Sequence, residues 1–144
     1  MDLLYFYFVL FAILFLFSSI PLENRKKGLP RLAAVGEKYD VVILDPPAFT
    51  KSREATKNAI KGYREINMKG LKLVKDGGYL ATCSCSHFMT QELLAKTVKE
   101  AAKATHKRLR QVEFRTQAPD HPITWAADDS YYLKFYIFQV CPQN

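Results

Sequence analysis

The chain has 144 residues, 49% of them hydrophobic, which is enough for one modest domain and too few for two large ones. Its 21 lysines and arginines outnumber 14 aspartates and glutamates, and the net charge of +7 favours a polyanionic partner such as nucleic acid. The three cysteines do not form a disulfide framework, because Cys83 and Cys85 would point the same way along a strand. Reduced thiols in a cytoplasmic protein are the simpler interpretation.

The chain begins with a long hydrophobic run. Residues 3–17 are all apolar or aromatic, and no charge lies between Asp2 and Glu23. Twenty such residues in a helix would span roughly 30 Å, the thickness of a bilayer's hydrocarbon core. The basic cluster at 25–27 would then leave the rest of the chain in the cytoplasm. We therefore expect residues 1–28 to be a hydrophobic segment and basic linker, with membrane association through 3–22 and a buried hydrophobic segment as alternatives.

A buried strand over 39–44 is the first clear element. Its β-branched residues run directly into Asp45, Pro46 and Pro47, which predicts a parallel strand that stops at a polar end. The prolines end the hydrogen-bonded ladder and stiffen the loop that follows. Ligands of open α/β sheets bind outside the carboxyl ends of such strands, so Asp45 is a candidate functional residue.

Alternating helices and strands follow. Apolar residues at three- and four-residue steps from Ala59 to Val74 predict an amphipathic helix of about twenty residues, which Asp76-Gly77-Gly78 should stop. A second strand is expected over 79–84. Thr90 should cap another helix that closes near His106. Two strands joined by a crossover helix predict a parallel pair.

The last part of the chain predicts two more strands. A short alternating strand is expected over 109–115 and an apolar one over 131–140, and these two should pair antiparallel. Between them lies a polar loop, 117–130, which contains the only tryptophan, Trp125. Loops of this length without structure of their own are usually functional.

Five motifs in this order resemble one enzyme family. They are Asp45-Pro-Pro-Ala-Phe49, Gly62-Tyr-Arg-Glu-Ile-Asn67, Gly77-Gly78, Thr82-Cys-Ser-Cys-Ser86 and Gln117-Ala-Pro-Asp-His-Pro122. Together they are similar to the bacterial S-adenosylmethionine-dependent methyltransferases that make 5-methylcytosine in large-subunit ribosomal RNA. The resemblance implies an α/β fold: the second half of a Rossmann-like class I methyltransferase sheet, with parallel strands, crossover helices and a final antiparallel strand.

The resemblance also implies a reaction and its residues. A cysteine thiolate would add to C6 of cytosine so that C5 can take the methyl group. Cys85 lies at the spacing from Gly78 at which the family's nucleophile falls, whereas Cys83 lies deeper in the strand and is assigned to packing; Cys83 as nucleophile, or both as buried small residues, stay open. Asp45 would face the base edge, and with Pro46 and Pro47 it would border S-adenosylmethionine.

Further residues could contact the RNA. Phe49 belongs to the stiff loop, and Lys51 and Arg53 begin a basic cluster that could hold phosphates or form an ordinary solvated surface. The resemblance adds Asp120 and His121, which could order the long loop over the RNA. His87 and Lys51 are candidates to keep Cys85 ionised. Zinc binding by Cys83, Cys85 and His87 is not favoured, because the separated ligand pair of known sites is missing.

The sequence departs from the family in two respects. No glycine-rich cofactor loop precedes the first strand, so 29–144 would be a partial catalytic domain whose first strand has an unpaired outer edge. Position 48 is alanine, where related enzymes often have a second cysteine. Methyl transfer by a partial domain is the first interpretation, and a non-catalytic, membrane-tethered remnant is the alternative.

Overall fold

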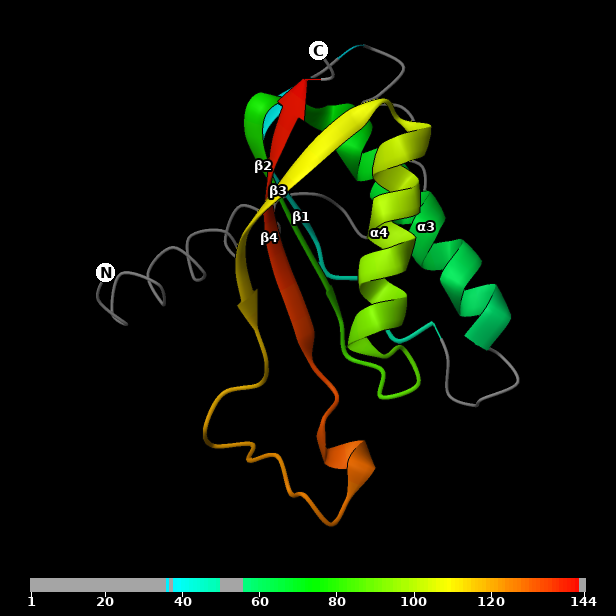
Figure 1. The fold of residues 1–144 in the computed structure, drawn as a ribbon, viewed down its shortest axis with the longest axis vertical. Coiled ribbons are helices and arrows are strands. Elements are labelled where there is room, and N and C mark those ends of the chain that lie inside the picture. Colours follow the sequence, from blue (N-terminus) through cyan, green and yellow to red (C-terminus); the bar gives the residue numbers. More distant parts are fainter. Residues whose placement is uncertain (1–35, 37, 50–55, 143–144) are drawn as a thin grey trace, which may run out of the picture.

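The computed structural model describes residues 36, 38–49 and 56–142, apart from the side chain of Asp128. These residues form one four-stranded sheet with the strand order β1-β2-β4-β3 (Figure 1). Strand β1 (Tyr39–Leu44) pairs parallel with β2 (Val74–Ser84), while β4 (Lys134–Pro142) pairs antiparallel with both β2 and β3 (Lys107–Arg115). The predicted parallel pair and the predicted antiparallel final pair are both confirmed.

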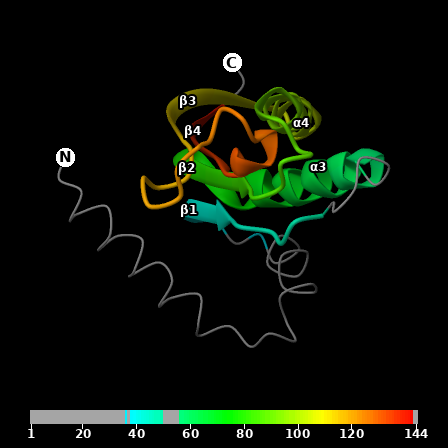
Figure 2. The same ribbon diagram turned by 90° about the horizontal axis from the view of Figure 1, so that it is seen from below.

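Both helices cover the same face of the sheet. Helix α3 (Thr56–Leu73) connects β1 to β2, and helix α4 (Gln91–Ala104) connects β2 to β3. Figures 1 and 2 show them side by side against that face. Their apolar stripes and the facing residues of the strands form the core, which includes Leu44, Leu71, Leu80 and Val140. The opposite face of β4 carries residues that are only half-buried, from Phe135 to Cys141 at alternate positions.

Helix α3 approaches β1 closely at one glycine. A Cβ added to Gly70 would lie 2.8 Å from Leu44 Cδ1, so the missing side chain lets the helix pack directly on the end of the strand. Leu44 immediately precedes Asp45. The contact therefore fixes the end of β1 from which Asp45 emerges.

The predicted helix stop at Asp76-Gly77-Gly78 is wrong. Helix α3 already ends at Leu73, and these residues lie within β2 as an irregularity in its pairing with β1. Gly77 has a φ of +84°, which glycine adopts without strain, and a Cβ on Gly78 would lie 2.7 Å from the backbone oxygen of Asp40. The two glycines therefore serve the strand pairing rather than a helix cap.

The other boundaries are close to those predicted. Thr90 caps α4 as expected, its side chain accepting a hydrogen bond from the Leu93 N–H at 3.2 Å, and the helix ends two residues before His106. Strand β4 begins at Lys134 rather than at Tyr131, because a short 3₁₀ turn at Asp128–Ser130 and an irregular stretch precede it.

Strand β1 lies at one edge of the sheet, and β2 is its only neighbour among the described residues, as predicted. No helix in this described part is long and apolar enough to cross a membrane. The span suggested for 3–22 lies outside the described residues, as do the side chains of Lys51 and Arg53.

Candidate active site

Asp45 meets Cys83 of β2 at one end of the sheet, and Cys85 follows the end of that strand. Because β1 and β2 are parallel, their carboxyl ends lie side by side. The Cys83 thiol donates a hydrogen bond to Asp45 Oδ1 at 3.1 Å and lies 3.6 Å from the Leu44 carbonyl oxygen. This contact links the carboxylate that follows β1 to a buried side chain of β2.

Cys83 is held as a neutral thiol. Its side chain is buried, and this burial raises the thiol pKa far above its ordinary value, with the hydrogen bond to Asp45 and the charge of that carboxylate adding to the effect. A thiol that stays protonated is a donor and not a nucleophile. In this structure the Cys83 thiol is a hydrogen-bond donor to Asp45.

Cys85 has the opposite environment. It follows the last residue of β2 and is exposed to solvent. Two buried groups feel its charge: burial raises the pKa of the Tyr63 hydroxyl and negative charge on Cys85 adds to that, whereas burial lowers the pKa of the Lys134 ammonium and Cys85 opposes that shift. The two residues that flank this thiol contact the same groups, since Ser84 Oγ lies 2.9 Å from the Tyr63 hydroxyl and the Ser86 carbonyl accepts from Lys134 at 2.6 Å.

Lys134 is the residue that the sequence interpretation missed. It is 1% exposed and the only buried charged residue in the described part of the chain. Its ammonium donates to the Ser86 carbonyl at 2.6 Å and to the Tyr132 carbonyl at 2.9 Å, and it lies 5.7 Å from the centre of the Tyr131 ring. No carboxylate of the described residues lies within ion-pair distance of it.

The environment of Lys134 favours an anionic neighbour. Burial lowers the pKa of this ammonium to about 8, and Cys85 opposes that shift. Two neutral carbonyl oxygens satisfy donors of the ammonium but do not neutralise its charge. A thiolate at Cys85 would supply the missing negative charge. The alternation of buried residues in β4 (Lys134, Tyr136, Phe138, Val140) was the sequence signal that could have identified it.

Tyr63 and Ser84 fix the turn that carries Cys85. The Tyr63 hydroxyl and Ser84 Oγ are 2.9 Å apart, and Ser84 Oγ accepts the Ser86 N–H at 3.3 Å. Burial is the main cause that raises the Tyr63 pKa, so the phenol stays neutral. The Phe49 ring packs edge-on against the Tyr63 ring with centroids 4.8 Å apart. Phe49, a predicted substrate residue, thus lies on the same network as the Cys85 turn.

The other predicted residues lie elsewhere. Asp120 and His121 are exposed in the loop between β3 and β4, where His121 Nδ1 lies 3.4 Å from Asp120 Oδ1 and the His121 ring is 6.5 Å from that of Tyr132. No contact joins either of them to Asp45 or Cys85 within the described residues. The rings of His87 and Phe88 lie with their centroids 3.8 Å apart at an angle of 38°.

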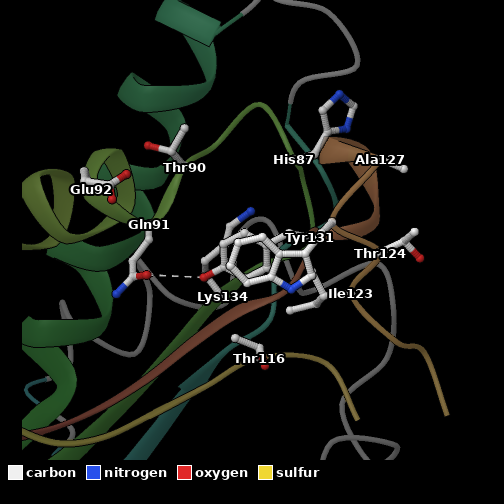
Figure 3. A pocket seen from close by; sticks show the side chains of 11 residues that line it. His87, Thr90, Gln91, Glu92, Thr116, Ile123, Thr124, Ala127, Tyr131 and Lys134 are labelled. Atoms are coloured by element: carbon white, nitrogen blue, oxygen red, sulfur yellow. Dashed lines mark hydrogen bonds between the residues drawn. The ribbon is translucent and has the colours of Figure 1, made fainter. Parts of the chain in front are cut away.

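A cavity of about 540 Å³ adjoins this site. It lies between the turn after β2, the start of α4 and the loop before β4, and Figure 3 shows Lys134, His87 and Thr116 on different sides of it. We call it the Trp125 pocket. Its lining residues are His87, Thr90, Gln91, Glu92, Thr116, Ile123, Thr124, Trp125, Ala127, Tyr131 and Lys134.

The residues present fit one side of a cofactor site. Asp45 and Pro47 are exposed and Pro46 is buried, directly after the outer strand β1. They offer a carboxylate and a rigid backbone at the carboxyl end of a parallel strand, where open α/β sheets bind ligands. Within the described residues, no three side chains of the kinds that bind metals converge.

Strand order, helix placement and the strand-end site define the class of fold: the second half of a Rossmann-like class I methyltransferase sheet. Two solved structures share it. SMU.776, assigned as a methyltransferase and solved with S-adenosylhomocysteine, matches 80% of this chain and 30% of its own with a TM-score of 0.66 at 18% identity. An S-adenosylmethionine-dependent methyltransferase of Streptococcus mutans matches 78% and 28% with a TM-score of 0.65 at 18% identity. No protein-family profile matches the chain.

Sequence relatives specify the group further: homologues of this chain are ribosomal RNA large subunit methyltransferases. The protein assigned this role as MJ1649 in Methanocaldococcus jannaschii is 44% identical over 104 residues, which are 72% of this chain and 26% of that protein. Ribosomal RNA large subunit methyltransferase I of Aeromonas salmonicida is 43% identical over 99 residues, 69% of this chain and 25% of that protein. The chain thus spans about a quarter of the length of these curated relatives.

Proposed function

We propose that this chain carries the nucleophile and base-binding part of an S-adenosylmethionine-dependent methyltransferase that acts on C5 of cytosine in large-subunit ribosomal RNA. The observation that carries the proposal is the exposed Cys85, whose neighbour Ser86 accepts a hydrogen bond from the buried Lys134. This turn follows β2 at the end of the sheet where Asp45 follows β1. Homology to ribosomal RNA large subunit methyltransferases and the net charge of +7 support RNA as the substrate.

Each residue has a distinct task. The ammonium of Lys134 stabilises negative charge on Cys85 Sγ, and its hydrogen bond to the Ser86 carbonyl holds the turn that presents the sulfur. Asp45, held by the Cys83 thiol, accepts a hydrogen bond from the exocyclic amine of cytosine. Asp45 and the two prolines after it border the cofactor, which supplies the methyl group when bound.

The covalent step follows from the low nucleophilicity of C5. Cys85 Sγ forms a bond to C6, and the electron pair of the C5–C6 double bond moves to C5, which takes up the methyl group. A water molecule then takes the proton on C5, and the electron pair of that C–H bond re-forms the C5–C6 double bond. The bond between C6 and Cys85 Sγ breaks as this happens, and its electron pair leaves with the sulfur. The thiolate then leaves beside the ammonium of Lys134, so the charge distribution of the free site is restored.

Transfer of a labelled methyl group to ribosomal RNA tests the proposal. The wild-type chain should label RNA at cytosine C5, and Cys85→Ala should abolish the label. Cys141→Ala is the matched control, because Cys141 lies at the far end of β4. A wild-type chain that is folded but transfers no methyl group overturns the proposal and favours the non-catalytic remnant. Unchanged activity in Cys85→Ala contradicts the covalent mechanism and favours methylation of an amino group.

A further inference from the structure

The only tryptophan of the chain is presented to solvent. Trp125 is 99% exposed, although indole is one of the largest apolar side chains. An exposed aromatic ring of this size beside a cavity is typical of a ligand-binding surface. The indole ring is therefore accessible for stacking with a flat ring of a ligand.

The turn that carries Trp125 is well defined. The Ala127 N–H donates to the Thr124 carbonyl at 2.9 Å, and the Thr124 N–H donates to Ser130 Oγ at 2.8 Å. Ser130 Oγ in turn lies 2.7 Å from the Ala127 carbonyl oxygen, and the Gln117 side chain donates to the Ser130 carbonyl. These hydrogen bonds stabilise the turn that contains Trp125 and so fix the backbone from which the exposed ring projects.

The Trp125 pocket has the size and lining of a site for a nucleobase. Its volume of about 540 Å³ falls within the roughly 300–1,000 Å³ of small-molecule pockets. Thr90, Gln91 and Thr124 bring hydrogen-bonding groups, and the Tyr131 hydroxyl holds Gln91 by donating to its Oε1 at 3.3 Å (Figure 3). An aromatic ring with polar groups around it matches the way proteins bind unpaired bases.

The charges of the pocket do not favour a phosphate. Glu92 lines it and is a carboxylate at neutral pH, since hydrogen bonds from its own backbone and from Thr90 lower its pKa. Lys134 is the only lysine or arginine in the lining, and in the proposed function the thiolate of Cys85 already balances its charge. A neutral ring with exocyclic donors suits this mixture better than an anion.

The pocket lies next to the turn that carries Cys85. Lys134 lines the pocket and binds the carbonyl of Ser86, the residue after Cys85, while His87 lies one residue further and also lines the pocket. In Figure 1 the loop carrying Trp125 extends from the same end of the sheet as the turn after β2. A ligand in the pocket would therefore adjoin the base at Cys85.

We propose that the Trp125 pocket binds a second, unpaired nucleobase of the RNA, a neighbour of the target cytosine, stacked on the indole of Trp125. The inference rests on the proposed function and extends it. The chain would thus require the target to lie in a single-stranded segment, with two bases turned towards the protein. The pocket would contribute to substrate selection and not to the chemical step.

Tryptophan fluorescence tests this directly, because all such emission comes from Trp125. The full chain is titrated with a short single-stranded RNA that contains one cytosine, with a strand lacking the bases beside that cytosine, and with a duplex. Anisotropy of a labelled strand gives the affinity independently. The intact single strand should quench the emission saturably, and the abasic strand and the duplex should quench far less.

Variants complete the test. Trp125→Ala should weaken single-strand binding about tenfold, as expected for the loss of one stacked base, while Trp125→Phe should recover part of the affinity. Val112→Ala, which removes an exposed apolar side chain of β3 outside the pocket, should bind like wild type. Binding without quenching, with Trp125→Ala unchanged, overturns the pocket and leaves the proposed function standing. Absence of RNA binding overturns both, and quenching without methyl transfer supports the pocket while contradicting the proposed chemistry.

Discussion

Cys83 and Asp45 are joined across two parallel strands by a hydrogen bond of 3.1 Å, in which the buried thiol is the donor. The bond distinguishes Cys83 of β2 from Cys85, which follows the strand. Cys83 orients the carboxylate and stays protonated, while Cys85, two residues further, is exposed. In the proposed function only Cys85 acts as the nucleophile.

Replacing Cys83 should affect Asp45 before it affects the fold. Cys83→Ala removes the donor and a small buried side chain, and should lower the free energy of unfolding by about 1–2 kcal/mol. Cys83→Ser keeps a donor at the same place and should retain more RNA methylation than the alanine variant. Urea denaturation and methyl-transfer assays on both variants measure this, and equal activity of the two would argue against a positioning bond.

The thiols should differ in reactivity. Iodoacetamide at neutral pH should modify Cys85 first and leave the buried Cys83 unmodified while the chain is folded. Lys134→Met should slow the modification of Cys85, because the variant lacks the ammonium that stabilises the thiolate. Peptide mass spectrometry over time gives the rates. Modification of Cys83 ahead of Cys85 would contradict the assignment.

Lys134 should make stability depend on pH in the alkaline range. Its pKa is about 8 in the folded chain and 10.5 ordinarily, so between these values the unfolded chain binds more protons and folding becomes more favourable as the pH rises. The 2.5-unit difference corresponds to about 3 kcal/mol at most. Urea denaturation of wild type and Lys134→Met from pH 7 to 10.5 should show the wild type gaining stability relative to the variant. Parallel curves would mean that Lys134 is not buried as a cation.

Two glycines of α3 should respond oppositely to alanine. Gly70→Ala places a methyl group 2.8 Å from Leu44 Cδ1, and this overpacking should cost about 1–3 kcal/mol, more than alanine's helix propensity returns. At Gly62 the nearest atom is Phe49 Cδ2 at 3.5 Å, an ordinary contact, so Gly62→Ala should be neutral or stabilising by up to about 1 kcal/mol. Thermal unfolding of the two variants compares them. A destabilisation of equal size at both positions would mean that Leu44 does not confine Gly70.

Local patterns in the sequence predicted much of the fold. Strand β1 has the boundaries expected from its β-branched run, and Thr90 caps α4 as its side chain allows. The helix end predicted at Asp76-Gly77-Gly78 was wrong because glycine suits a helix end as well as a strand irregularity. Which of the two forms depends on the close approach of the Asp40 backbone, and Asp40 is distant in sequence.

The candidate residues that follow the strands could be predicted from the sequence. The residues that surround them could not. Asp45 lies where a run of apolar residues stops, so the pattern alone places it at a strand end. The choice of Cys85 came from the family resemblance. Lys134 depends on the pairing of β2 with β4, because only that pairing brings it to the Ser86 carbonyl. The exposure of Trp125 and the cavity beside it likewise depend on how the loop folds back towards α4.

Formation of a covalent adduct between Cys85 and cytosine tests the central claim most directly. RNA containing 5-fluorocytidine at the target should stop the reaction after methyl transfer, because fluorine cannot leave C5 as the proton does. The account predicts a species with the mass of chain plus RNA that forms only with S-adenosylmethionine and is linked through Cys85. No adduct from a folded chain, or a link through Cys83, would contradict it.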